Sequence, residues 1–585
     1  MRASLCGMSR RPSPAWESRA ATLAGAGAAA LWVVLCVRWF DDGAAWRPPA
    51  LEALPPALIG AALLALFLVW LRARGRELSG APLGRRAVSG LLLVVGLALL
   101  ARLPFVVHGA ASGITPDGTV YGSVALRLQQ GTARLAFLPS QPYGGTLKSH
   151  LAVPLMEVMD PARAFALVSV GLYALFVAGL YRLTLWLFGG GVALLAGLYV
   201  AFSPAGLTRA SLSNDGTYIE MLAFGVWALW LCARWADEAE PRPLLAGAAG
   251  LLLGLAFWCH IFAVIHLAVV ALAIVAFGRR RALRPLAAFL SGWALGAAPA
   301  LLWNAANGWE SFEYFLPGKA RAIGGGTGAL LAGLGGKVAA MVKGDWPLLM
   351  GYDLGYDPPI DLLLLGLGWL GTVAAAVAVG RTAREAARTR SRPLALLLLF
   401  VATTLGVVAV ALPHVPGNSR YLTCLMSVLP ALIAEAFGRG IRRVVLFVLV
   451  AGSALASLAQ LPGAARSDAH WREFVAHLEA EPVPFCYTDF YLATRINFLS
   501  GERVICSSKL GPTTTEYFPD YRARVEAAPE AALVPVNRTA AARLERRLQD
   551  LGVACQQRDW MKPVLLPSRK VDPEELFPGR EFPMR

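Results

Sequence analysis

Residues 88–107 read VSGLLLVVGLALLARLPFVV, an apolar run that contains one arginine, Arg102. A helix needs about 20 mostly apolar residues to cross a bilayer, so this run predicts a membrane-spanning helix. The chain then becomes polar, and residues 115–122 read TPDGTVYG. The two stretches together predict a helix that ends at a membrane surface and leads into a loop carrying an acidic residue, Asp117.

The composition of the whole chain agrees with this prediction. The 585 residues are 56% hydrophobic and 16% charged, and the mean hydropathy is +0.54. A soluble domain carries about 25% charged residues. The composition therefore excludes a set of ordinary soluble domains, a disordered chain and a disulfide-rich secreted scaffold, and it indicates a polytopic membrane protein.

Apolar runs of similar length recur along the chain and predict about thirteen transmembrane helices. They lie at residues 21–40, 54–72, 88–107, 163–187, 190–204, 217–236, 244–260, 262–278, 285–303, 360–380, 393–413, 419–437 and 443–461.

The formal net charge of +16 comes from arginines that gather between apolar runs. This arrangement follows membrane topology rather than nucleic-acid binding, because cytoplasmic loops carry an excess of Lys and Arg. The clusters precede the first span and follow the second, eighth, tenth and twelfth spans. They predict a cytoplasmic N-terminus and an extracytoplasmic C-terminus.

This topology divides the chain into three parts. Residues 1–87 hold the N-terminus and two extra helices, residues 88–461 form a membrane core, and residues 462–585 form a tail. The core carries two large outer loops, at 108–162 and 304–358. In the tail, strand-like runs at Val483–Thr488, Arg503–Ser507 and Ala532–Val536 alternate with helical patterns such as Thr539–Leu551. The alternation predicts a small extracytoplasmic α/β domain, where Cys486 and Cys506 could lie on neighbouring strands.

Asp117 is the main candidate for chemistry, because a carboxylate at a membrane boundary can act as a general base. The alternative is that it caps the helix predicted to follow it. Further along the same loop, Lys148 and His150 could meet a phosphate as a point charge and a hydrogen-bond donor. Their alternative is contact with lipid headgroups or water. Between these positions, the pair Gly144-Gly145 predicts a tight turn.

Other candidates also lie near predicted outer boundaries. Asp215 follows Asn214 in a turn signal, whereas Glu220 lies about one turn into a span, where an ionisable group usually faces a cavity or a partner. His260 lies between two spans, where a structural role is the more common one. Arg420 lies on the outer side, against the usual charge bias, which suggests either an anionic partner or snorkelling.

Taken in order, these segments resemble the C-type integral-membrane glycosyltransferases, a class named GT-C, and within it bacterial proteins related to protein O-mannosyltransferases and aminoarabinose transferases. Pro116-Asp117 stands where the class has its catalytic Asp, with Gly118 where Glu often follows. Residues 141–155 look like the next loop motif, in which some relatives have a phosphate-binding Lys. Gly216–Glu220, Trp258–His260, Asn304–Gly308 and Arg420–Leu429 look like further landmarks of the class.

The resemblance implies transfer of a sugar from a polyprenyl-phosphate donor to an extracytoplasmic lipid, glycan or protein, with inversion and with Asp117 as the base. It also implies a multi-pass protein of the bacterial inner membrane, in contact with membrane lipids and not with nucleic acid. No cofactor is certain, a divalent metal is left open and no metal ligand is assigned. The residues expected to bind substrate are Tyr121, Gln141, Lys148, His150, Asp215, Tyr218, Glu220, His260, Arg420 and Tyr421.

Two other functions fit a polytopic chain. A transporter or a flippase for lipid-linked glycans also needs many spans and buried charges. A membrane scaffold or sensor would use the tail as its binding module. The candidate residues gather at the outer boundary rather than at the midplane, which favours the transferase.

Overall fold

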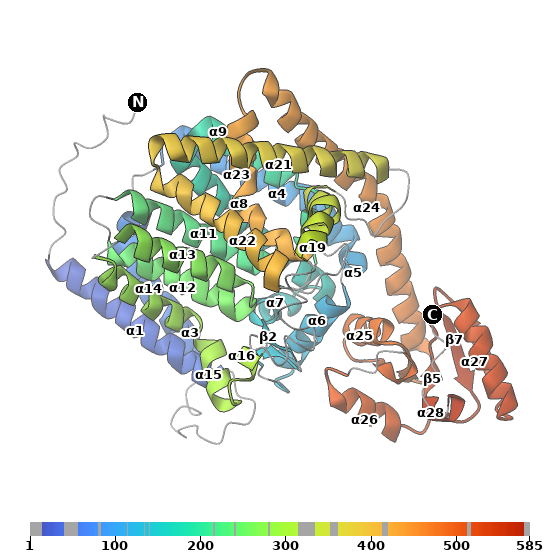
Figure 1. Ribbon diagram of the computed structural model, residues 1–585. Helices are drawn as coiled ribbons and strands as arrows, with labels where there is room; N and C mark the ends of the chain where they lie inside the picture. The colour runs from blue at the N-terminus through green and yellow to red at the C-terminus, as the bar shows by residue number, and fades with distance from the viewer. Residues whose placement is uncertain are drawn as a thin grey trace.

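The computed structural model shows a large helical bundle with a smaller domain at its C-terminal end (Figure 1). It describes residues 15–39, 56–79, 83–113, 115–133, 135–139, 141–213, 217–238, 242–278, 281–313, 334–351, 361–411, 419–511 and 516–577.

Within these residues, eight helices are long and apolar enough to cross a membrane. They are α1 (Ala15–Trp39), α3 (Pro56–Ser79), α4 (Arg85–His108), α8 (Pro161–Phe188), α11 (Tyr218–Asp237), α21 (Asp361–Thr389), α22 (Arg392–Ala411) and α24 (Arg443–Ala480).

Two bent helix pairs raise this number to ten if each pair is one span. The pair α14 (Leu283–Gly296) and α15 (Ala298–Ala306) bends by 68°, and the pair η4 (Ser419–Ser427) and α23 (Leu429–Phe437) bends by 62°. Each second helix has a proline in its first turn, Pro299 or Pro430, which cannot donate the hydrogen bond that would continue the preceding helix.

Three shorter apolar helices complete the bundle: α9 (Gly190–Ala201), α12 (Pro243–Cys259) and α13 (Ala263–Gly278). Each apolar run expected from the sequence coincides with one of these helices or helix pairs. The predicted class, a polytopic α-helical membrane protein, is confirmed. The number of spans, thirteen, stays a prediction.

Helices α12 and α14 pack closely because glycines face each other. A Cβ atom on Gly250 would lie 2.0 Å from the carbonyl oxygen of Phe289, and one on Gly292 would lie 2.1 Å from the oxygen of Gly247. Small residues let membrane helices approach to backbone contact. The pair therefore forms a rigid wall of the bundle.

Arg102 of α4 is buried, with 1% of its surface exposed, and it contacts neutral groups of other helices and loops. Its guanidinium donates to the hydroxyls of Ser211 and Ser203, at 2.6 and 2.9 Å, and lies 3.9 Å from the ring centre of Tyr173. These contacts spread the buried charge over hydroxyl groups and an aromatic ring.

The first outer loop folds into short elements on one end of the bundle. These are α5 (Ala110–Gly113), α6 (Pro116–Gln129), β1 (Phe137–Leu138), β2 (Gln141–Gly145) and α7 (Leu147–Met156). Strands β1 and β2 pair antiparallel. Residues 314–333 and 352–360 of the second predicted loop lie outside the described residues. The other short helices are α10 (Ala205–Ala210), α16 (Glu310–Glu313), α19 (Leu334–Ala340), η2 (Met341–Asp345), α20 (Trp346–Met350) and η5 (Gly440–Arg442).

The tail contains a five-stranded sheet in the order β4-β3-β5-β7-β6. Strand β3 pairs parallel with β4 and β5, and β7 pairs antiparallel with β5 and β6. The strands are β3 (Phe485–Tyr487), β4 (Ile505–Ser507), β5 (Ala532–Leu533), β6 (Cys555–Asp559) and β7 (Pro563–Pro567). The helices are α25 (Phe490–Leu499), η6 (Ser508–Leu510), α26 (Pro519–Ala527), α27 (Arg538–Asp550) and α28 (Pro573–Leu576). The small α/β unit expected near the C-terminus is confirmed.

Helix α24 joins the two parts and continues without interruption through Pro462 to Ala480. The backbone amide of Ala111 in α5 donates to Asp468 of α24 at 2.6 Å. Arg472 contacts Asp468 at 2.7 Å and Asp160, the N-cap of α8, at 3.0 Å. The second half of α24 is therefore bound to the end of the bundle that carries α5 and the start of α8.

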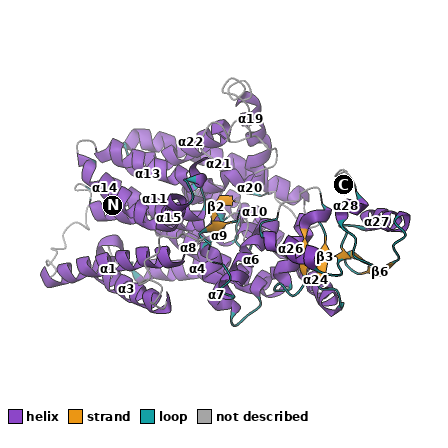
Figure 2. Cartoon of the chain, turned by 90° about the horizontal axis from the view of Figure 1, so that it is seen from below, coloured by secondary structure: helices purple, strands orange, loops and turns teal. Residues whose placement is uncertain are grey.

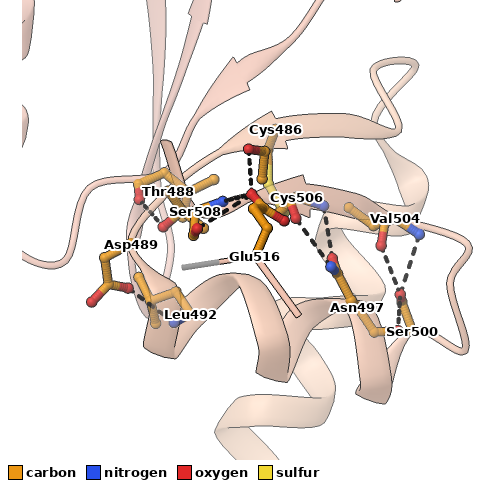
Figure 3. Close-up of a disulfide and its surroundings, with 12 residues drawn as sticks. Cys486, Thr488, Asp489, Leu492, Asn497, Ser500, Val504, Cys506, Ser508 and Glu516 are labelled. Atoms are coloured by element: carbon orange, nitrogen blue, oxygen red, sulfur yellow. Dashed lines mark hydrogen bonds between the residues drawn. A yellow bond between two sulfur atoms is a disulfide. The ribbon is translucent and has the colours of Figure 1, made fainter. Parts of the chain in front are cut away.

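A disulfide closes the edge of the tail sheet (Figure 3). Cys486 and Cys506 face each other in the register of β3 and β4 and are bonded. Asn497 of α25 holds the same strand, because its side chain accepts from the Cys506 amide at 2.7 Å and donates to the Cys506 carbonyl at 3.0 Å. The disulfide thus joins β3 to β4, and Asn497 joins α25 to β4.

We expect the Cys486→Ser/Cys506→Ser double variant to lower the stability of the tail by about 3 kcal/mol, because a cross-link over about 20 residues restricts the unfolded chain. The thermal midpoint of the purified protein measures this loss. Cys555→Ser is the control, because Cys555 is a free thiol. Alkylation of both Cys486 and Cys506 in the native protein without reductant would contradict the pairing.

Candidate active site

Asp117 lies in the first turn of α6, where the helix dipole favours a negative charge. The cap of this helix is Thr115, whose hydroxyl accepts from the amide of Gly118 at 3.2 Å. The alternative that Asp117 itself is the N-cap is therefore wrong, because Thr115 occupies that position. Its carboxylate is half-buried rather than fully exposed.

Lys148 and Glu220 form an ion pair in the interior. Lys148 comes from α7 and Glu220 from the first turn of α11, and the distance from Nζ to Oε1 is 3.3 Å. Their side chains are 1% and 0% exposed. Neither carboxylate oxygen of Glu220 has a hydrogen-bond partner among the described residues. Such a pair is unusual, because buried charges normally gain additional hydrogen bonds.

Tyr121 lies beside this pair. Burial and the charge of Glu220 raise the pKa of the Tyr121 phenol well above its usual value, and the charge of Asp117 acts in the same direction. The hydroxyl of Ser149, which follows Lys148, donates to the Tyr121 carbonyl at 2.8 Å. Tyr121 therefore lies within the electrostatic reach of both Asp117 and Glu220.

A chain of aromatic rings continues from this cluster. Tyr218 and His260 have ring centres 4.6 Å apart, and His260 and Phe262 are 5.0 Å apart. Phe262 meets Tyr421 at 5.2 Å, and the Arg420 guanidinium lies 5.3 Å from the Tyr421 ring centre. The end of this chain is open, because Arg420 is exposed.

His260 is neutral in this setting. Burial, and to a smaller extent the charge of Arg420, lowers the pKa of His260 to about 3. Its Nδ1 atom accepts a hydrogen bond from the Phe262 amide at 3.0 Å. The ring therefore acts as a neutral hydrogen-bonding and stacking group at neutral pH.

Two other predicted residues lie elsewhere. The side chain of Gln141 donates to the hydroxyl of Tyr517 in the tail. His150 is half-buried, with Nε2 3.4 Å from the Leu135 carbonyl, and burial lowers its pKa to about 4. Neither has a described contact with the Lys148–Glu220 pair. Asp215 lies outside the described residues.

The Gly144-Gly145 pair does not form the predicted turn. Both residues belong to β2, and Gly144 forms a β-bridge with His260. A Cβ atom on Gly145 would lie 2.0 Å from the Trp258 carbonyl oxygen, and one on Gly144 would lie 2.5 Å from the Tyr121 hydroxyl. The prediction of a turn was wrong. Glycine is needed at these positions because β2 comes close to the Trp258 carbonyl and the Tyr121 hydroxyl, not because the chain changes direction.

Thr217 was not among the candidates, although it joins two parts of the cluster. Its backbone has a φ of 53°, a conformation that is rare outside glycine, and its hydroxyl donates to the Cys259 carbonyl at 2.6 Å. It also forms a side-chain hydrogen bond with Tyr121. Its position after the turn signal Asn214-Asp215-Gly216 was the only available indication in the sequence.

The tail domain contacts α6 from the side opposite the bundle. Arg127 contacts Asp520 at 2.7 Å and Glu502 at 3.3 Å, and it lies over the ring of Phe518 at 4.1 Å. A Cβ atom on Gly122 would lie 2.5 Å from the ring of Phe498. The helix that carries Asp117 is therefore held by both parts of the molecule.

The described residues provide no cluster of side chains that could bind a metal ion. Within the described residues, no group of three or more His, Cys, Asp or Glu side chains could hold an ion.

The comparisons place the fold. No family model matches the chain and no curated protein matches it. The fold is similar to that of ArnT from Cupriavidus metallidurans bound to undecaprenyl phosphate, with a TM-score of 0.56 and 12% identity over 81% of this chain and 97% of that one. For ArnT in the apo state the TM-score is 0.53, with 12% identity over 82% and 98% of the two chains.

A third similar structure is the Archaeoglobus fulgidus oligosaccharyltransferase in complex with Zn and sulfate, with a TM-score of 0.46 and 13% identity over 79% and 69% of the two chains. The conclusion about the fold rests on the two ArnT structures, and ArnT is a GT-C glycosyltransferase. The resemblance in fold that the sequence suggested is confirmed: the chain has the GT-C membrane fold.

We expect the single variants Lys148→Met and Glu220→Gln each to lower the free energy of unfolding by about 3–5 kcal/mol, because each one leaves the charge of the other residue buried and unpaired. The double variant Lys148→Met/Glu220→Gln should recover most of this loss, because it removes both charges. Unfolding in mixed detergent micelles measures the cycle.

The control cycle uses Arg503 and Glu479, an ion pair with side chains 67% and 27% exposed. Its coupling should stay below about 1 kcal/mol. Additive losses in the Lys148 and Glu220 variants would show that the two charges do not stabilise each other.

Proposed function

We propose that this protein is a membrane glycosyltransferase that moves a sugar from a polyprenyl-phosphate donor to an extracytoplasmic acceptor. The observation that carries the proposal is the placement of Asp117, Tyr121, Lys148 and Glu220 at one end of a GT-C membrane fold. The structure of ArnT, which is similar in fold, has undecaprenyl phosphate bound. A lipid-phosphate donor needs no nucleotide-binding motif, and the sequence contains none.

In this proposal Asp117 is the general base. It accepts the proton of an acceptor hydroxyl or amine while the acceptor atom attacks the anomeric carbon of the sugar. The bond between that carbon and the phosphate oxygen breaks, and the lipid phosphate leaves with the bonding electrons. The attack from the opposite face inverts the anomeric carbon. Asp117 is only half-buried in the first turn of α6, so an acceptor can reach its carboxylate.

Lys148 and Arg420 would stabilise the phosphate that leaves. Lys148 already has Glu220 at 3.3 Å, so a bound phosphate would share or replace that partner. Arg420 is exposed, so a phosphate can approach it from the surface of the protein. Glu220 would then hold Lys148 in place when no donor is bound.

The other predicted residues would form the surroundings of the substrates. Tyr218, His260 and Tyr421 belong to the aromatic chain that leads from Glu220 to Arg420, and such rings can stack on a sugar. Gln141, His150 and Asp215 stay proposals for acceptor or donor contacts. A divalent metal is compatible with this function, and EDTA in the transfer assay tests it.

The proposed placement follows from the positions of the arginines. The protein would lie in the bacterial inner membrane, with a cytoplasmic N-terminus and an extracytoplasmic tail. Residues 1–87 would add two helices to a catalytic core at 88–461, and residues 462–585 would form the outer domain. The acceptor, a lipid, a glycan or a protein, would approach from the outer side.

We expect Asp117→Asn to lower the rate of sugar transfer by about 10²–10⁴-fold, the usual contribution of a general base. Purified protein in lipid would receive radiolabelled polyprenyl-phosphate sugars, with membrane extract as acceptor. Asp559→Asn is the matched control, because Asp559 lies on β6 at the far edge of the tail sheet. Near-native transfer by a folded Asp117→Asn variant would refute the assignment of the base. Movement of donor across vesicles without transfer would indicate a flippase instead.

A further inference from the structure

The helix pair α1 and α3 lies at the edge of the bundle, away from the tail (Figures 1 and 2). Most of each helix is not buried in the protein. Only 22% of the most apolar stretch of α1 and 6% of that of α3 are buried. On the bundle side α1 contacts α15, and residues of α12 and α14, the wall built by facing glycines, line the space beside the pair. Contact between the pair and the wall is therefore incomplete.

Two polar contacts hold the pair to the bundle at its opposite ends. At one end, the indole of Trp32 in α1 donates to the Leu295 carbonyl in α14 at 2.9 Å. At the other end, Arg234 of α11 donates to the carbonyls of Leu78 and Glu77 in the last turn of α3, the latter at 3.3 Å. These contacts fix the ends of the pair while its middle stands off from the wall.

A cavity of about 440 Å³ occupies the space between these ends. Its lining is apolar and includes Trp32, Gly60, Phe67, Leu251 and Leu295. A volume of this size is typical of a ligand site, not of a packing defect. An acyl chain in this open, apolar space would gain dispersion contacts with its walls, so the lining suits an apolar occupant.

A second cavity of about 440 Å³ continues the first one, and both are lined by Gly25 and Trp70. The second cavity also has Arg74 and Glu77 in its wall. Arg74 contacts Glu77 at 3.0 Å through Nη1, and the two side chains are 26% and 40% exposed. An arginine carries five N–H donors, so this contact leaves donors for an anion. The combined site therefore has an apolar body and a polar end formed by Arg74 and Glu77.

The length of the site matches one leaflet of a bilayer. On α12 its lining extends from Leu244 to Leu255, which is about 16 Å at 1.5 Å per residue. One leaflet contributes about 15 Å to the hydrocarbon core. Arg74 lines the end of the site that lies near the end of α3, where its donors can attract an anionic headgroup.

We propose that the space between the α1–α3 pair and the α12–α14 wall binds one anionic phospholipid, with an acyl chain in the apolar cavity and the headgroup phosphate at Arg74. The bound lipid completes the contact that the protein leaves open, and it attaches the N-terminal helix pair to the bundle. This site is separate from the cluster around Asp117 and does not depend on the transferase reaction.

The test is native mass spectrometry of the purified protein, loaded with palmitoyl-oleoyl-phosphatidylglycerol or the matching phosphatidylcholine and then washed with detergent. We expect one retained phosphatidylglycerol per chain. Gly60→Phe should abolish this retention, because a Cβ atom at Gly60 meets nothing within 4 Å and the ring can enter the cavity. Ala29→Phe is a second variant that fills the same cavity. Leu68→Phe is the matched control, because Leu68 is 52% exposed and does not line the site.

The headgroup contact has its own pair of variants. Arg74→Ala should lower the preference for phosphatidylglycerol over phosphatidylcholine about fivefold. Arg72→Ala should leave it unchanged, since Arg72 is exposed and lies outside both cavities. An equal effect of the two variants would overturn the assigned headgroup position.

Three further results would overturn the proposal. The first is retention of the lipid by both cavity-filling variants, and the second is selective retention of undecaprenyl phosphate in place of phosphatidylglycerol. The third comes from the unmodified protein, so that it does not depend on variants that fold. A phosphatidylglycerol with a diazirine in its acyl chain should cross-link to α1, α3, α12 or α14, and labelling confined to other helices would refute the site.

Discussion

Buried charge must be compensated, and this constraint explains how the first outer loop is attached to the bundle. Lys148 and Glu220 are 1% and 0% exposed and come from different helices, α7 and α11. Removing a single charge from water costs several kcal/mol, so neither residue is stable in this place without the other. Their pairing brings the loop onto the bundle at the point where Tyr121 and His260 also lie.

The buried charge of Arg102 in α4 is compensated in a different way. Arg102 directs its nitrogens to serine hydroxyls, carbonyl oxygens and the Tyr173 ring, which compensate its charge locally. Glu220 has Lys148 but no hydrogen-bond partner for either oxygen among the described residues. A satisfied charge is typical of structure, whereas an incompletely satisfied one is typical of a site that meets a ligand. The two residues looked alike as intramembrane charges, and only their surroundings separate them.

Helix α6 connects chemistry to architecture. On one side, Tyr121 faces the ion pair and Thr217, and on the other, Gly122 and Arg127 meet the tail domain. The tail is itself held by the disulfide between β3 and β4 and by α24, which continues from the membrane bundle into the tail. The position of Asp117 therefore depends on contacts from both the membrane bundle and the tail.

Local features could be predicted well. Apolar runs such as residues 88–107 are helices in the structure, because a segment in lipid must satisfy its own backbone hydrogen bonds. The strand-like runs at Val483–Thr488 and Arg503–Ser507 became β3 and β4 because alternation of strands and helices is also a local pattern. The turn predicted at Gly144-Gly145 was wrong, since the reason for a glycine there is the distant Trp258 carbonyl.

The sequence by itself determined that this is a helical membrane protein with a small α/β unit near its C-terminus, because hydropathy and periodicity are properties of consecutive residues. The tertiary structure alone decided which polar residues meet. Lys148 pairs with Glu220, Gln141 contacts Tyr517 of the tail, and Arg74 lies at the end of an apolar cavity between helices far apart in sequence. Such contacts depend on how whole helices pack, and the pattern within one segment carries no information about the side chains that another segment brings to it.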